Sequence, residues 1–291
     1  MGFIEELRQG PILVADGAMG TLLQSAGLPS GMLPEEWNAL EPARVEAAHR
    51  SYLEAGARII LTNSFGASRI KLARAGKAAD AERFNRLAAE IARRAAEPYN
   101  AFVAGDMGPT GELMEPMGTL TPDLAREAYA AQAGALAAAG VDLILVETMS
   151  DLSEARAAIE GAQQATDLPV VCTMSFDTRG RTMMGVRPEQ MIDALWPLGL
   201  AAIGPNCGRS LEENLEALCQ MRRANPEAVL WVKPNAGLPR LADGNVVYDT
   251  GPADFAEYAR RFAQCGARVI GGCCGSAPAH IAALARALAE P

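Results

Sequence analysis

Basic residues, aromatic residues and long apolar runs are all scarce in this chain of 291 residues. With 26 Lys and Arg against 35 Asp and Glu, its formal net charge is −9. That balance argues against nucleic acid or an anionic membrane as a partner, because both call for a basic face. No stretch is apolar over the length that a membrane-spanning helix needs. The sequence therefore predicts neither a membrane nor nucleic acid among the partners of this protein.

The N-terminal residues also predict no export signal. The N-terminal segment MGFIEELRQGP is acidic and amphipathic, without the basic and apolar regions of a signal peptide. We therefore expect a cytoplasmic protein whose six cysteines stay reduced and available to a metal.

Histidine occurs only twice, and we interpret both His49 and His280 as structural. Cysteine carries more information. An adjacent pair, Cys273 and Cys274, lies in GGCCG near the C-terminus, and Cys207 lies in GPNCG upstream. Three thiolates around Zn²⁺ leave one tetrahedral position open, which is typical of a catalytic zinc site. Such a site is electron-rich and suited to making a bound thiolate nucleophilic.

The alternative for these cysteines is that they are buried or redox-active residues, since free cysteine often behaves as a small hydrophobic side chain. A disulfide between adjacent residues is strained, which favours the metal. The remaining cysteines lie within strand or helix patterns and are predicted core residues: Cys172, Cys219 and Cys265.

Short β-rich apolar runs alternate with alanine-rich helical stretches, the pattern of a parallel sheet with crossover helices. The predicted strands are 11–15, 57–61, 102–105, 143–146, 169–174, 201–204, 229–232 and 267–270. The predicted helices are 42–55, 78–97, 122–139, 151–165, 188–196, 211–224, 252–265 and 278–289. We therefore predict an α/β fold, a (β/α)8 TIM barrel forming a single domain over residues 1–291. A doubly wound open sheet is the alternative.

Polar residues follow these strands, at the end where active sites of such barrels lie. In chain order they are Asp16, Thr62-Asn63-Ser64, Asp106, Glu147, Ser175, Asn206-Cys207, Asn235 and Cys273-Cys274. Because all strand ends share one face of a barrel, the cysteines after the sixth and eighth strands are expected on the same side of the rim. This placement strengthens the prediction of a zinc site.

Six motifs span nearly the whole chain: DGAMGT (16–21), TNSFGAS (62–68), ETM (147–149), GPNCG (204–208), KPNAGLP (233–239) and GGCCGSAPAHI (271–281). In this order they resemble the homocysteine S-methyltransferases, among them the homocysteine-binding barrel of cobalamin-dependent methionine synthase, betaine–homocysteine S-methyltransferase and related free-standing enzymes. The separated NC and GGCC motifs together are highly specific. The resemblance implies an enzyme that transfers a methyl group to the thiol of homocysteine, giving methionine.

The resemblance also implies roles for the cysteines. Cys207, Cys273 and Cys274 are the expected zinc ligands, and act in catalysis through the metal, which binds the sulfur of homocysteine in the fourth position. Metal coordination deprotonates a thiol whose ordinary pKa is about 8.5. The thiolate then displaces the methyl group directly, which needs a positioned nucleophile and no general base.

The amino-acid end of homocysteine needs a carboxylate for its ammonium group. Glu147 is the expected partner, by resemblance, and a rim ion pair is its alternative role. Asp16, in a tight turn with Gly17 and Ala18, is a second candidate for substrate binding, and otherwise it holds that turn.

Three further polar residues have open roles. Thr62 and Asn63 are candidates for hydroxyl and amide contacts with substrate, or else cap a loop. Asn235 is a candidate fourth zinc ligand when substrate is absent, because a thiolate readily displaces a side-chain oxygen. Its alternative role is to form the turn before Gly237.

The methyl donor is the least determined feature. A betaine or sulfonium donor presents a cation that suits an aromatic cage, and Trp37 is the expected donor-side residue. The tyrosines that betaine-using relatives carry are replaced here by Gly66 and Thr148. We therefore predict a methylcorrinoid on a partner protein as donor. The alternative is a small cationic donor: betaine, S-methylmethionine or dimethylsulfoniopropionate.

Two other functions remain open at this point. The chain could be a non-catalytic, zinc-binding subunit of a methyltransferase complex, although the intact cysteines and Glu147 count against it. It could also methylate a thiol other than homocysteine.

Overall fold

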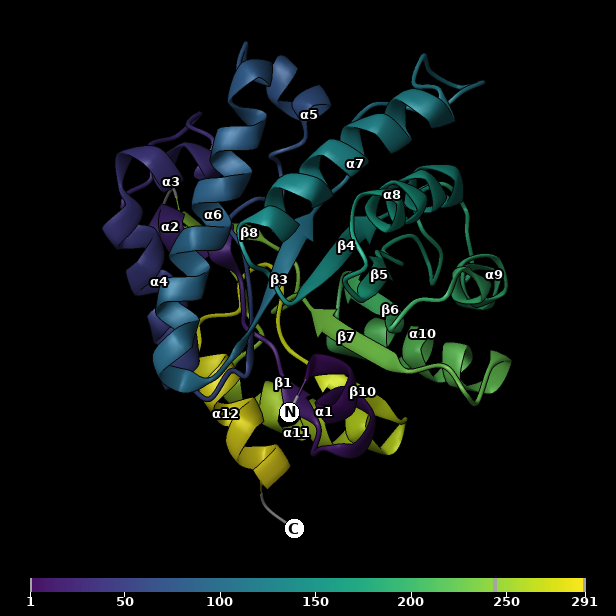
Figure 1. The fold of residues 1–291 in the computed structure, drawn as a ribbon. Helices are drawn as coiled ribbons and strands as arrows, with labels where there is room; N and C mark the ends of the chain where they lie inside the picture. The colour runs from purple at the N-terminus through teal and green to yellow at the C-terminus, as the bar shows by residue number, and fades with distance from the viewer. Residues whose placement is uncertain (1, 243–244, 290–291) are drawn as a thin grey trace.

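Eight parallel strands form a barrel with helices around it in the computed structural model, which describes residues 2–242 and 245–289 (Figure 1). The strands are β1 Leu13–Val14, β2 Ile59–Leu61, β3 Phe102–Met107, β4 Leu143–Met149, β5 Val170–Met174, β6 Ala202–Cys207, β7 Leu230–Pro234 and β10 Ala267–Ile270. Their order in the sheet is β1-β10-β7-β6-β5-β4-β3-β2. A parallel bridge between Ala15 and Ile59 joins the two end strands. The predicted (β/α)8 barrel is confirmed, and its extent as one domain over 1–291 stays a prediction.

Each predicted crossover helix is present. They are α4 Pro42–Glu54, α6 Ala81–Ala96, α7 Pro122–Ala138, α8 Leu152–Ala165, α9 Pro188–Leu195, α10 Leu211–Ala224, α11 Pro252–Gln264 and α12 Pro278–Ala289. Several start with Pro at the first turn, where its missing N–H costs no helical hydrogen bond. The ends differ from the predicted ones by a few residues at most.

Several short elements are not anticipated by the sequence patterns. Helix α1 (Phe3–Gln9) covers the N-terminal end of the barrel, where Phe3 and Leu7 pack against the interior residues of the strands. The loops after the strands contain α2 (Met19–Ser25), α3 (Trp37–Leu40), α5 (Arg69–Ala73) and an antiparallel pair, β8 (Arg240–Ala242) and β9 (Asn245–Val247). These elements are too short to show a clear periodicity.

The hydrophobic core has two parts, one inside the barrel and one between the strands and the helices. Alternate residues along each strand belong to different parts. On β4, Leu143 and Leu145 belong to the cluster inside the barrel, whereas Ile144 and Val146 belong to the larger cluster between the strands and the helices. Alternate side chains of a barrel strand point to opposite faces, so both faces are apolar. This rigid scaffold carries the polar residues at the strand ends.

The cysteines outside the predicted metal site differ in their surroundings. Cys172 on β5 is fully buried, as predicted. Cys219 on α10 and Cys265 at the end of α11, predicted as core residues, are instead bonded to each other as a disulfide, with 5.6 Å between their Cα atoms. Strand and helix patterns show which residues are apolar, but not that two positions on neighbouring helices face each other.

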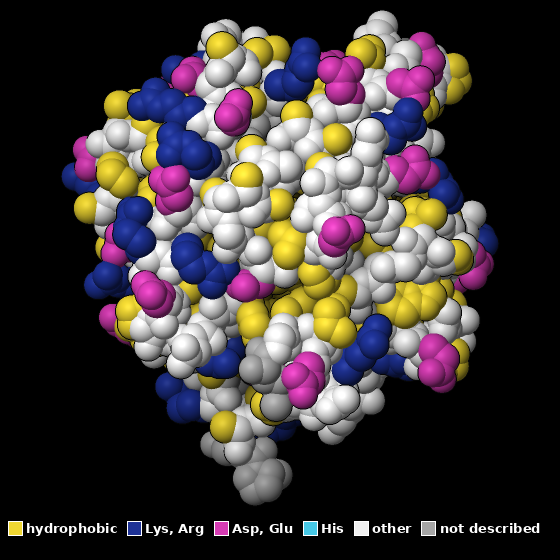
Figure 2. Space-filling model, viewed as in Figure 1, with side chains coloured by type: hydrophobic (Ala, Val, Ile, Leu, Met, Phe, Trp, Pro, Cys, Tyr) yellow, Lys and Arg dark blue, Asp and Glu magenta, His cyan; other side chains and the backbone are white. Residues whose placement is uncertain are grey.

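The surface agrees with the low basic charge. On the face in Figure 2, Lys and Arg side chains are interspersed with Asp and Glu side chains. Among the described residues, no helix has the length and apolarity needed to cross a membrane.

Candidate active site

A cavity of about 370 Å³ lies at the C-terminal ends of the strands. Three of these strands extend further than predicted, so Asp106, Glu147 and Cys207 are strand residues and do not lie in the loops. All three line the cavity, together with Gly17, Ala18, Thr62, Asn63, Lys233, Cys273 and Cys274. The barrel thus gathers residues that lie up to about 250 positions apart in the sequence.

The three predicted metal ligands come together at this cavity. The Sγ atoms of Cys207, Cys273 and Cys274 all lie within 4.8 Å of one another, and those of Cys207 and Cys273 are 2.9 Å apart. Hydrogen bonds from the other two thiols lower the pKa of Cys274 to about 3. This soft, closely spaced donor set fits a thiolate-binding metal such as zinc.

The backbone at Cys207 is held in an unusual conformation. Cys207 has a φ of +55°, in the left-handed region that non-glycine residues seldom adopt. Its carbonyl accepts hydrogen bonds from Asn214 Nδ2 (2.8 Å) and from the backbone N–H of Asn235 (3.1 Å). Strain of this kind persists where surrounding contacts hold it, and it is frequent at functional sites.

Thr148, next to Glu147 on β4, also has a left-handed backbone conformation, as Cys207 does on β6, with a φ of +61°. Asn206 joins it to Cys207's strand: Asn206 Nδ2 donates to Thr148 Oγ1 (2.6 Å), and Thr148 N–H donates to Asn206 Oδ1 (3.1 Å). The ends of β4 and β6 are therefore fixed relative to each other. This fixes the cysteine cluster relative to Glu147.

Backbone contacts shape the turn that carries the adjacent cysteines. Cys273 N–H donates to Pro234 O at 2.8 Å, and Ser276 Oγ donates to Cys273 O at 2.6 Å. Gly275 has a φ of +81°, and the ring of Tyr248 occupies the space that a Cβ there would need. The turn is thus held without help from the thiols.

Asn235, the candidate fourth ligand, lies beside this cluster. Its Nδ2 donates to Gly208 O at 2.8 Å, while its buried Oδ1 has no hydrogen-bond partner among the described residues. An orphaned acceptor of this kind fits a ligand role, which stays a proposal.

Two carboxyl groups face each other in the cavity. Burial raises the pKa of Glu147 to about 8, against the opposing charge of Lys233, and Glu147 forms a hydrogen bond with Asp106. Burial also raises the pKa of Asp106 well above its ordinary range, and the charge of Glu147 adds to this. Both shifts favour the protonated forms, and a ligand's ammonium group bound beside the two carboxyl groups would favour their charged forms instead.

Asp16 is tied to the barrel itself. Its Oδ1 accepts a hydrogen bond from Lys233 Nζ at 2.6 Å, and its Oδ2 accepts one from the Leu61 N–H at 2.7 Å. Both charged side chains are about 2% exposed or less. The sequence leaves two roles for Asp16, binding the substrate or holding the turn, and these contacts match the second. Asp16 affects the cavity through its ion pair with Lys233.

The other predicted substrate residues line the cavity with their polar groups already engaged. Thr62 Oγ1 accepts from the Asp106 N–H (2.9 Å) and bonds Ser64 Oγ (2.6 Å). Asn63 Nδ2 donates to Pro34 O (2.7 Å). The N–H of Ala18 donates to Ser276 O (3.1 Å). Gly17 is needed where it is, because a Cβ there would lie 2.7 Å from Ser276 O.

Trp37 does not reach the cavity. Its side chain is 3% exposed and packs in a separate cluster with Leu23, Leu28 and Val45. The indole on α3 packs against residues of α2 and α4, and its donor-side role stays a prediction. A Trp in a loop sequence gives no sign of which way its ring points.

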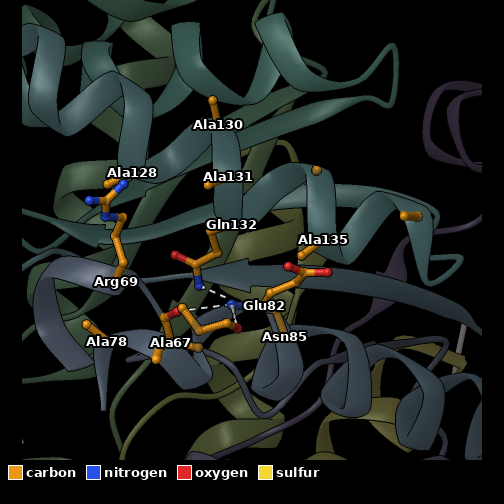
Figure 3. Close-up of a pocket in the computed structure, with 14 residues that line it drawn as sticks. Ala67, Arg69, Ala78, Glu82, Asn85, Ala128, Ala130, Ala131, Gln132 and Ala135 are labelled. Carbon is orange, nitrogen blue, oxygen red and sulfur yellow. Dashed lines mark hydrogen bonds between the residues drawn. The ribbon is translucent and has the colours of Figure 1, made fainter. Parts of the chain in front are cut away.

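A larger hollow, about 660 Å³, lies outside the barrel between α6 and α7 (Figure 3). Alanines form most of its lining, and Gln132 Nε2 at its floor donates to Asn85 Oδ1 at 3.2 Å. It contains none of the cysteines and no pair of facing carboxyl groups. The chemistry therefore belongs to the smaller cavity.

A family model described as homocysteine S-methyltransferase matches residues 13–288. The chain belongs to the homocysteine S-methyltransferase family. Its members are methyltransferases, and the resemblance read from the motifs is confirmed.

Individual proteins that are similar to this chain include methionine synthases and a homocysteine methyltransferase of known structure. The methionine synthases of Mycobacterium tuberculosis and Mycobacterium leprae are 35% and 34% identical to it, over 96% of this chain and 25% and 24% of those proteins. The chain thus spans about a quarter of the length of these relatives. The metallated homocysteine methyltransferase MmuM from Escherichia coli has a TM-score of 0.81 at 26% identity, over 96% of this chain and 97% of MmuM.

Sequence reasoning gave no role to four residues that line the cavity: Glu35, Lys71, Asp106 and Lys233. Asp106 has a sequence signal, since it follows a predicted strand, and Lys233 stands in the KPN motif. Glu35 and Lys71 have no such signal, because they lie in short elements that the patterns do not reveal.

Proposed function

We propose that this chain catalyses zinc-dependent methyl transfer to the thiol of homocysteine, giving methionine. The observation that carries the proposal is the cluster of Cys207, Cys273 and Cys274, with sulfur atoms within 4.8 Å of one another, in a cavity that also contains Glu147. Membership of the family supports the acceptor. A metallated form of the similar MmuM supports a metal at such a site.

Zinc held by the three thiolates would bind the homocysteine sulfur in the remaining position and keep it as a nucleophilic thiolate. The protein's own groups then orient the rest of the substrate. Glu147, hydrogen-bonded to Asp106, receives the ammonium group. Asn235 Oδ1 would hold the fourth position of the metal when no substrate is bound.

For the donor, we propose a methylcorrinoid carried by a partner protein. The aromatic cage that would favour a small cation is missing, since Gly66 and Thr148 stand where betaine-using relatives carry tyrosines and Trp37 is buried. The resemblance of the motifs to the homocysteine-binding barrel of cobalamin-dependent methionine synthase supports the same donor. Small cationic donors remain the second candidate.

A donor comparison tests this choice. With zinc-loaded protein and homocysteine, we expect better turnover with a protein-bound methylcorrinoid than with betaine, which should be weak or inactive. Methionine formation is the measurement. Efficient, saturable betaine turnover would contradict the donor assignment. Zinc and homocysteine binding without turnover of any donor, including S-methylmethionine, would instead indicate a non-catalytic subunit.

Glu147→Gln tests the binding of the substrate's amino-acid end. Because a hydrogen bond to a charged group contributes roughly 1.5–3 kcal/mol, homocysteine binding should weaken by that amount. The zinc content should not change. Calorimetry with homocysteine and with a simple alkyl thiol measures the effect, and the alkyl thiol should bind as before. Equal losses for both thiols would mean that Glu147 supports the site's structure and does not bind the ammonium group.

A further inference from the structure

Two polar side chains contact the sulfur atom of Cys207. Asn206 Nδ2 lies 3.7 Å from Cys207 Sγ, and Thr148 Oγ1 lies 3.8 Å from it. Thr148 is part of the cavity wall, and Asn206 is fully buried. Both contacts are long, so each is weak by itself. Together they bring an amide and a hydroxyl group to one of the three proposed metal ligands.

Neighbouring hydrogen bonds settle which atoms donate. A side-chain amide has one accepting and one donating atom. Asn206 Oδ1 accepts from the Thr148 N–H at 3.1 Å, so Nδ2 is the atom that donates to Thr148 Oγ1 at 2.6 Å. Thr148 Oγ1 thus accepts with its oxygen and keeps its hydrogen for another partner. Cys207 Sγ is the acceptor in contact, and the hydroxyl group donates to it.

The backbone at Thr148 is an unfavourable place for a threonine. Its φ is +61°, in the left-handed region where β-branched side chains are genuine outliers. Asparagine would adopt this conformation at a lower cost. Strained residues of this kind cluster at functional sites, where a particular side chain is needed. The group that distinguishes threonine here is the hydroxyl that bonds the sulfur.

The charge of the proposed metal site gives this hydrogen bond a use. Three cysteine thiolates and the thiolate of the substrate would place four negative charges around one Zn²⁺. Each of the four sulfur atoms is then a potential nucleophile. Hydrogen bonds around a metal-bound sulfur tune its electronic properties, because they take up part of its charge. A thiolate that accepts hydrogen bonds is accordingly the weaker nucleophile.

We propose that Thr148, oriented by Asn206, is a positioning residue whose hydroxyl group lowers the nucleophilicity of the Cys207 thiolate, so that the substrate's sulfur is methylated in preference to this ligand. The inference rests on the proposed zinc-dependent methylation of homocysteine. Methylation of Cys207 would turn a charged ligand into a neutral thioether and weaken the hold on the metal. The hydrogen bond therefore protects the site from its own reaction.

Methyl iodide tests the reactivity of each ligand without homocysteine or a biological methyl donor. The thiolate bonds to the methyl carbon, and iodide leaves with the electron pair of the broken bond. Cys219 and Cys265 are joined as a disulfide and Cys172 is fully buried, so the reaction reports on the three cluster cysteines. With zinc-loaded protein at a low extent of reaction, mass spectrometry gives the rate at each cysteine.

Thr148→Val removes the hydroxyl group and keeps the β-branched shape, so the backbone strain stays the same. The rate at Cys207 should rise about three- to tenfold, the effect of one lost hydrogen bond, while the rate at Cys274 should not change. Thr148→Ser keeps the hydroxyl group and should react like the unaltered protein. Thr182→Val is the matched control, because it removes a buried hydroxyl group that bonds Ser150 O away from the cavity.

Cobalt(II) in place of zinc gives a spectroscopic readout. Hydrogen bonds stabilise the electrons on a metal-bound sulfur, so their loss in Thr148→Val should move the sulfur-to-cobalt charge-transfer band to lower energy. Thr148→Ser should keep the band of the unaltered protein. Where Thr148→Val does not fold, Thr148→Ala serves in both experiments, since it removes the hydroxyl group and relieves part of the backbone strain.

An unchanged rate at Cys207 together with an unchanged cobalt band, in a folded variant, would overturn the inference. Equal increases at all three cysteines would also overturn it, because they would show a general loosening of the site. If homocysteine is methylated by the unaltered protein, either failure leaves the proposed function standing. If the expected rates and band shift are found but no homocysteine is methylated, the role of the Thr148 hydroxyl toward Cys207 is supported and the proposed function fails.

Discussion

Cys273→Ala is expected to remove most of the bound zinc and all detectable methyl transfer. The Sγ atom of Cys273 lies 2.9 Å from that of Cys207, in the middle of the cluster, so its loss leaves two thiolates for a metal that needs three protein ligands. Without the metal, the homocysteine thiol stays mostly protonated near neutral pH. Zinc analysis and a methionine-formation assay measure the two effects.

The fold should survive this change. The turn at Cys273 is held by backbone groups, through the hydrogen bonds to Pro234 O and from Ser276 Oγ, and the core contains none of the three cluster cysteines. Cys172→Ala is the matched control, because it removes a thiol that is buried in β5 away from the cavity. It should keep its zinc. Full zinc occupancy in Cys273→Ala, with an unchanged circular dichroism spectrum, would exclude Cys273 as a ligand.

The barrel and the cysteine cluster could be predicted because both depend on order along the chain. Alternating strands and helices place every strand end on one face, so Cys207 and Cys273 had to approach each other once the strands were assigned. The same reasoning brought Glu147 and Asp106 to the rim. Strand ends are positions that a sequence pattern can give to within a few residues.

Side-chain direction could not be predicted in the same way. Trp37 and Glu35 lie two residues apart in one loop, yet the indole is buried outside the cavity and the carboxylate lines it. That difference arises from the 3₁₀ turn and α3, which are too short to have a sequence signature. The contact between Glu35 and Gly66 likewise depends on two loops meeting.

The buried ion pair of Lys233 could not be predicted from the sequence either, because its partner Asp16 is 217 residues away. The predicted strand ends at 232, whereas β7 continues through Lys233 to Pro234 and buries the lysine beside Asp16. Burial by itself lowers the pKa of Lys233, but the charges of Asp16 and Glu147 outweigh this and hold the pKa above its ordinary value. The ammonium group therefore stays charged inside the barrel and neutralises part of the acidic cluster.

Lys233→Met should therefore destabilise the protein strongly. Breaking a buried ion pair by removing one partner costs about 3–5 kcal/mol of unfolding free energy, because it leaves the other charge uncompensated. Asp16, whose pKa burial already raises, would then be stable in the folded protein mainly in its protonated form. A carboxyl with a raised folded-state pKa contributes stability at low pH and loses it as the pH rises through that pKa. The loss should accordingly be larger at pH 8 than at pH 5.5.

Denaturant unfolding of Lys233→Met, Asp16→Asn and the double variant at both pH values tests this account. Removing both charges leaves no uncompensated ion, so the double variant should be more stable than Lys233→Met alone, and its stability should depend less on pH. Additive losses in the double variant would show that the two side chains act independently. A loss below about 1 kcal/mol in Lys233→Met, the range of exposed pairs, would mean that water reaches the ammonium group and that Asp16 does not depend on it.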